Sequence, residues 1–194
     1  MKKIVLILTL LSLGKTAQAT NTIPSNPTSQ PLRITLTSEQ KQLIEKLKNQ
    51  VQSHLASPQM STLKTLGTYI QKDIFNITKS LWETSNNQLL QAQNRDVSLS
   101  TKSKHRETFA LLIKFFEEIN HAVEPLVQKY HSLSKDRAKT KQNDASKKSS
   151  NGSFEKKEEY YALQQNVVIP LAECKEVVDK ATNLALIKLL EYLN

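Results

Sequence analysis

Residues 101–133, TKSKHRETFALLIKFFEEINHAVEPLVQKYHSL, decide the fold of this chain. Their apolar residues are separated alternately by three and four positions, which is the 3.5-residue period of heptad packing. Such a period predicts either a coiled-coil seam or one face of a helix in a bundle, because both structures use the same packing. The stripe consists of Phe109, Leu112, Phe116, Ile119, Val123, Leu126, Tyr130 and Leu133.

A second long helix is predicted from about residue 155 to 193, with the same alternation. Towards its end the apolar arc becomes wider, which predicts burial on several sides, by the bundle or by a partner. The stripe is Tyr160, Leu163, Val167, Leu171, Cys174, Val178, Ala181 and Ala185, and the wider arc adds Leu184, Leu186, Ile187, Leu189, Leu190 and Leu193.

Two further helices are predicted earlier in the chain, over residues 38–57 and 61–93. The first begins with a capping box formed by Thr37 and Gln40 and ends before Pro58. Few glycines are available for β-turns, and good helix formers dominate the composition. The sequence therefore predicts an all-α, elongated antiparallel bundle of about four helices, in which the last two form a long coiled-coil-like hairpin.

Each long helix contains one proline, Pro125 in the third and Pro170 in the fourth. Proline lacks an N–H and clashes with the preceding turn, so each should kink its helix. If the hairpin turns near Lys147-Lys148, the two prolines lie opposite each other. We therefore expect one bend shared by both helices.

Residues 1–19 have the three parts of a cleavable secretory signal peptide. Met1-Lys2-Lys3 is positively charged, residues 4–13 are mostly apolar, and Ala17-Gln18-Ala19 is a small-x-small cleavage site. The apolar run is about ten residues, whereas a bilayer-spanning helix needs roughly twenty. These features predict cleavage near Ala19 and export to the periplasm or out of the cell, with no transmembrane segment in the remaining chain.

Residues 20–37 contain three prolines and many Ser, Thr and Asn residues, which predicts an extended, disordered lead-in. Leu32, Ile34 and Leu36 alternate within it and can dock on the core as a short extended strip. Residues 38–194 are then expected to form a single helical-bundle domain.

Once residues 1–19 are removed, most of the remaining net charge lies in residues 134–154. Removing residues 1–19 deletes three lysines and no acid, so the net charge falls from +9 to +6, and residues 134–154 alone carry +4. This composition predicts a mobile basic loop that can contact anionic lipid or polysaccharide. The lack of interleaved aromatic residues and the signal peptide disfavour nucleic acid. The candidate contacts are Lys135, Arg137, Lys139, Lys141, Lys147 and Lys148.

No catalytic, cofactor or metal site is predicted. Glu118 and His121 have the spacing of one half of a carboxylate-bridged di-metal site. The other histidines, His54, His105 and His131, lack a glutamate three residues earlier, so the second half is missing. Gly-rich phosphate loops are also missing. The sequence therefore indicates a protein that is not an enzyme.

Cys174 is the single cysteine. Because it falls on the apolar stripe, we expect a buried thiol; the alternative is an intermolecular disulfide in an oxidising compartment.

The functional hypothesis is an exported, non-enzymatic interaction protein, such as a secreted effector, an envelope adaptor or a periplasmic holding factor. It would bind a protein partner or associate with itself through helical surfaces. The alternatives are a binder of anionic surfaces through residues 134–154 and a structural subunit of a secretion or surface assembly. The expected partner-docking face is Leu186, Ile187, Leu190 and Leu193.

Overall fold

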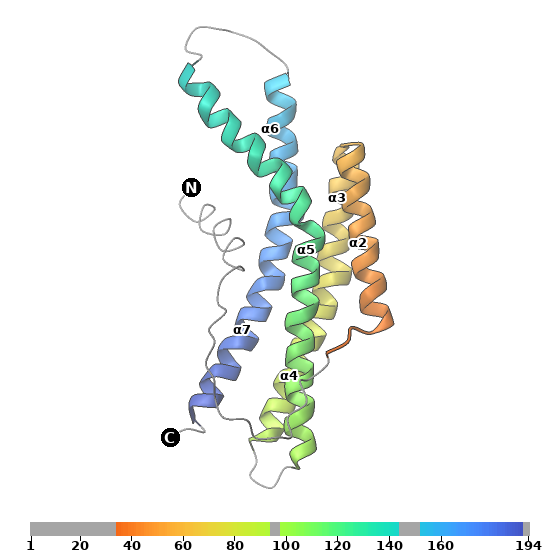
Figure 1. The fold of residues 1–194 in the computed structure, drawn as a ribbon, viewed down its shortest axis with the longest axis vertical. Helices are drawn as coiled ribbons and strands as arrows, with labels where there is room; N and C mark the ends of the chain where they lie inside the picture. The colour runs from red at the N-terminus through yellow and green to blue at the C-terminus, as the bar shows by residue number, and fades with distance from the viewer. Residues whose placement is uncertain (1–33, 94–97, 144–151, 192–194) are drawn as a thin grey trace, which may run out of the picture. The chain divides into compact units, whose positions relative to one another are not determined.

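Residues 34–93, 98–143 and 152–191 are described by the structure, a computed structural model, and they form an all-α bundle of four helical segments without strands (Figure 1). Successive segments run in opposite directions in Figure 1. Two of them are single helices and two contain a π-turn, labelled η. The elements are α2 (Ser38–Ala56), α3 (Met60–Tyr69), η1 (Ile70–Ile74), α4 (Phe75–Ala92), α5 (Leu99–Asn143), α6 (Gly152–Leu163), η2 (Gln164–Val168) and α7 (Ile169–Glu191).

The start of α2 confirms the predicted capping box. The backbone N–H of Gln40 donates to the Thr37 hydroxyl oxygen at 3.2 Å, and the Thr37 N–H donates to the Gln40 side-chain oxygen at 2.9 Å. The helix ends at Ala56, two residues before Pro58. These two hydrogen bonds satisfy backbone N–H groups that have no partner within the helix, and they mark where it begins.

Most of the predicted stripe on α5 lies in the core, with Phe109 only partly buried, but the buried face of this helix is wider than the stripe. Phe115 is fully buried and Ala122 is nearly so, although neither belongs to the 3.5-residue pattern. The helix packs most extensively on α4, then on α2, and less on α7. The packing is therefore that of a globular bundle, in which α4 is the main neighbour of α5.

The predicted loop over residues 134–154 is wrong at both ends. In the structure α5 stays helical to Asn143 and α6 starts at Gly152. Lys, Arg, Ala and Gln are good helix formers, and extending an existing helix avoids the cost of nucleation. Residues 144–151 lie outside the described part of the chain.

Two π-turns interrupt the second and fourth helical segments. In η1 the N–H of Phe75 donates to the carbonyl of Ile70, and in η2 the N–H of Ile169 donates to the carbonyl of Gln164. Each bond spans five residues instead of four, so each turn contains one additional residue. The segments around the two turns pack together, α3 against η2 and η1 against α7.

Pro170 lies two residues after η2 and is buried. It has no N–H to donate to the carbonyl of Asn166, its partner in a regular α-helix. The Asn166 side-chain amide donates in turn to the carbonyl of Ala162 at 2.8 Å. The hydrogen-bond ladder is therefore rearranged at this proline, which sequence analysis predicted only as a kink.

Pro125 is exposed, and α5 remains helical across it. Figure 1 shows that α5 changes direction where its colour passes from green to teal. The bend shared by Pro125 and Pro170 stays a prediction.

Gly67 marks the closest approach of α3 to η2. A Cβ at this position would lie 2.7 Å from both the Cβ and the carbonyl oxygen of Asn166, and 3.0 Å from its Cα. Real Cβ atoms do not approach backbone this closely. The glycine therefore permits the close crossing of α3 and η2.

Residues 34–37 show that the end of the predicted lead-in is held on the bundle. Leu36 belongs to the core, and the Lys114 ammonium donates to the Ile34 carbonyl at 2.8 Å. The predicted docking of Leu36 on the core is therefore confirmed. The predicted signal peptide and residues 20–33 lie outside the described residues. Within the described ranges, no helix combines the length and apolarity needed to cross a lipid bilayer.

Candidate functional site

Most of the predicted stripe on the last helix is buried, whereas two of the large apolar residues beyond it are exposed. Cys174 and Val178 lie in the core. Leu186 and Ile187, at adjacent positions further along α7, are 54 % and 53 % exposed. These are two of the four predicted docking residues; the side chain of Leu190 and the whole of Leu193 lie outside the description.

The exposed part of α7 carries little charge. Residues 181–188 contain one charged residue, Lys188. Because the backbone is helical, its N–H and C=O groups are paired within the helix. This segment therefore offers a partner two large apolar side chains on a fixed backbone.

The structure does not bring the predicted basic residues together in a describable site. The backbone of Lys135, Arg137, Lys139 and Lys141 lies in α5, but their side chains are outside the described part of the chain. Lys147 and Lys148 lie wholly outside it.

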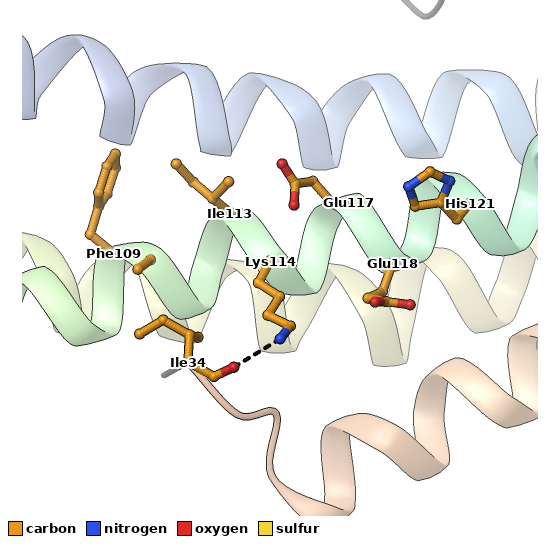
Figure 2. Close-up of a pocket in the computed structure, with 8 residues that line it drawn as sticks. Ile34, Phe109, Ile113, Lys114, Glu117, Glu118 and His121 are labelled. Atoms are coloured by element: carbon orange, nitrogen blue, oxygen red, sulfur yellow. Dashed lines mark hydrogen bonds between the residues drawn. The ribbon is translucent and has the colours of Figure 1, made fainter. Parts of the chain in front are cut away.

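A shallow groove follows α5 beside the first described residues (Figure 2). Phe109 and Ile113 form its apolar part, and Figure 2 shows them pointing towards α7. Glu118 and His121, the pair considered above as half of a metal site, also line it. His121 instead lies 3.8 Å from Glu124, measured from Nδ1 to Oε2, and its side chain is exposed. Among the described residues, no three His, Cys, Asp or Glu side chains group closely enough to hold a metal ion.

A buried polar cluster that sequence analysis missed joins α2, α3, α5 and α6. His54 is 1 % exposed; its Nδ1 lies 2.6 Å from the Thr62 hydroxyl and its Nε2 lies 3.0 Å from the Tyr130 hydroxyl. The Tyr130 hydroxyl also lies 3.3 Å from the Glu159 carboxylate. A signal for this cluster exists in the sequence, because His54 continues the three-four spacing of Leu47 and Val51.

Burial shifts the titration of both rings in this cluster. The pKa of His54 is lowered below the ordinary value of 6.5, first by burial and then by the charge of Lys129, while Glu159 acts in the opposite direction. Burial raises the pKa of Tyr130 to about 12, with the Glu159 charge and hydrogen bond adding to the effect. Both rings are therefore neutral at neutral pH.

Cys174 is buried as predicted, and burial raises the pKa of its thiol to about 12. A hydrogen bond with Thr78 acts against this shift.

We expect Ellman's reagent to modify Cys174 in the folded protein at pH 8 at least about 100-fold more slowly than in 6 M guanidinium chloride, because the reactive species is the exposed thiolate. Equal rates, or a disulfide-linked dimer on a non-reducing gel, would show that the thiol is accessible.

No family model, curated protein or solved structure matches the chain.

Proposed function

We propose that the protein is an exported, non-enzymatic interaction protein that binds a protein partner through the C-terminal part of α7. The observation that carries this proposal is the adjacent exposure of Leu186 and Ile187 beyond the buried stripe of the same helix. Burying a side chain of this size is worth about 1.5–3 kcal/mol. This segment is therefore suited to bind an apolar surface on a partner. Export rests on the signal-peptide pattern in residues 1–19.

The chemistry of the segment favours a protein over an anionic ligand. Binding of nucleic acid or anionic lipid relies on several Lys or Arg side chains facing phosphates. Residues 181–188 have a single lysine and two large exposed apolar residues. Protein interfaces, by contrast, have cores depleted in charge and rich in large apolar side chains.

Replacing Ile187 with glutamate tests this proposal. We expect I187E to weaken capture of the partner from an extract of the producing cells by at least about tenfold, because about 1.4 kcal/mol is enough for that change and a buried, unpaired carboxylate costs more. The matched control is I169E, which changes the same residue type on the same helix at a position that is 42 % exposed. Urea unfolding should show both variants within about 0.5 kcal/mol of the wild type.

Equal capture of the partner by I187E and I169E would exclude the C-terminal part of α7 as the binding surface. Binding to anionic vesicles that is lost on replacing Lys139 and Lys141 with glutamine, and unaffected by I187E, would support the alternative of an anionic-surface binder. Light scattering of the purified protein separates a second copy of the chain from a different partner, since only self-association raises the mass.

A further inference from the structure

The buried cluster around His54 contains four close polar contacts in a row. The Thr62 hydroxyl lies 2.6 Å from the Gln59 carbonyl, and its oxygen lies 2.6 Å from His54 Nδ1. His54 Nε2 lies 3.0 Å from the Tyr130 hydroxyl, which lies 3.3 Å from Glu159. The row thus connects the cap of α3 to α2, α5 and α6.

Counting hydrogens shows that neutral His54 cannot complete this row. Each hydroxyl has one hydrogen, and a neutral imidazole has one N–H. With the hydrogen on Nδ1, Tyr130 must donate to Nε2, so Glu159 receives no hydrogen from it. With the hydrogen on Nε2, Thr62 must donate to Nδ1, so the Gln59 carbonyl no longer accepts a hydrogen from Thr62.

Protonated His54 satisfies all four contacts at once. Nδ1–H donates to Thr62, which donates to Gln59, and Nε2–H donates to Tyr130, which donates to Glu159. We propose that His54 is a proton-responsive junction of the bundle. In the neutral form with its hydrogen on Nδ1, the imidazole accepts the Tyr130 hydroxyl hydrogen at Nε2. Uptake of one proton from solvent at Nε2 reverses this hydrogen bond, so that Nε2–H donates to the Tyr130 oxygen and the Tyr130 hydroxyl donates to Glu159.

The groups facing His54 determine in which direction the junction responds. Burial and the Lys129 ammonium on α5 oppose the imidazolium, the Glu159 carboxylate on α6 favours it, and Thr62 on α3 carries no charge. Because the opposing influences are larger, the pKa is lowered in the folded state. As the pH falls below 6.5, the unfolded chain gains its proton first, so the fold loses stability until the folded-state pKa is passed. Glu159, acting through Tyr130, limits this loss.

NMR titration of the His54 ring in the purified protein tests the junction. We expect E159Q to lower the His54 titration midpoint, whereas the neighbouring exposed substitution E158Q leaves it at the wild-type value. If Tyr130 carries the coupling, E159Q should shift the midpoint less in a Y130F background than in the wild-type background. An unchanged midpoint in E159Q, or an equal shift with and without the Tyr130 hydroxyl, would overturn the proposal.

Urea unfolding gives a second, independent measurement. Between pH 7.5 and 5.5, the unfolding equilibrium constant of E159Q should rise more than that of the wild type or E158Q. In H54Q, which keeps a polar side chain but has no titrating ring, the rise should be smaller than in the wild type. An H54Q variant with the full wild-type pH dependence would contradict a role for His54.

Discussion

Replacing Gly67 with alanine is expected to lower the free energy of unfolding by about 2–4 kcal/mol. The added Cβ would meet the backbone of Asn166 at 2.7 Å, and backbone cannot move aside as the end of a flexible side chain can. The clash lies where α3 crosses η2, so relieving it requires the two helical segments to separate.

The sign of the change makes this prediction sharp. In an unhindered helix, replacing glycine with alanine stabilises by about 0.5–1 kcal/mol. Urea unfolding of G67A therefore distinguishes the two cases. A close contact between α3 and η2 predicts a lower free energy of unfolding, and an unhindered helix predicts a higher one. T68A, at the neighbouring exposed position, is the control. A stabilised G67A would show that α3 and η2 are not in close contact.

Replacing Phe115 with alanine is expected to reduce the free energy of unfolding by about 3–5 kcal/mol. Phe115 is fully buried, although it lies outside the 3.5-residue stripe of α5. Phe109 belongs to that stripe, but it is only partly buried. We therefore expect F115A to destabilise the protein more than F109A.

The comparison distinguishes the two kinds of packing that the sequence pattern allows. In a coiled-coil seam the stripe residues contribute most, so F109A would have the larger effect. In a globular bundle, residues across the whole buried face contribute to the free energy of unfolding, so F115A has the larger effect. Urea unfolding of both variants measures the difference, and a loss below about 1.5 kcal/mol for F115A would contradict the bundle packing described above.

The parts of the fold that depend on local sequence were predictable. The capping box at Thr37 and the stripes of the long helices follow from residue type and spacing. The capping box is confirmed, and so is the burial of most of the stripe residues that the structure describes. The neighbours of α5 were not predictable, because an apolar face does not specify which other face covers it. The low apolar content of residues 134–143 predicts a loop, but their helix propensity is high enough to extend α5 to Asn143.

The close crossing and the polar cluster depend on contacts between distant segments. Gly67 meets Asn166, and His54 meets Tyr130 across 76 positions of sequence. Spacing can place His54 on an inner face, but the identity of its partner requires the fold. For the docking face, the sequence left open whether the bundle or a partner covers the wide arc; the exposure of Leu186 and Ile187 shows that the described bundle does not bury them.

The most direct test of the proposed function is photo-crosslinking from position 187. A benzophenone amino acid is placed at Ile187 or, as the control, at Ile169, and the protein is irradiated in the cells that produce it. The proposal predicts a discrete protein adduct from position 187 that is absent or at least about tenfold weaker from position 169, since only the first lies in the interface. Equal adduct yields from the two positions would contradict the claim that the C-terminal part of α7 binds a protein partner.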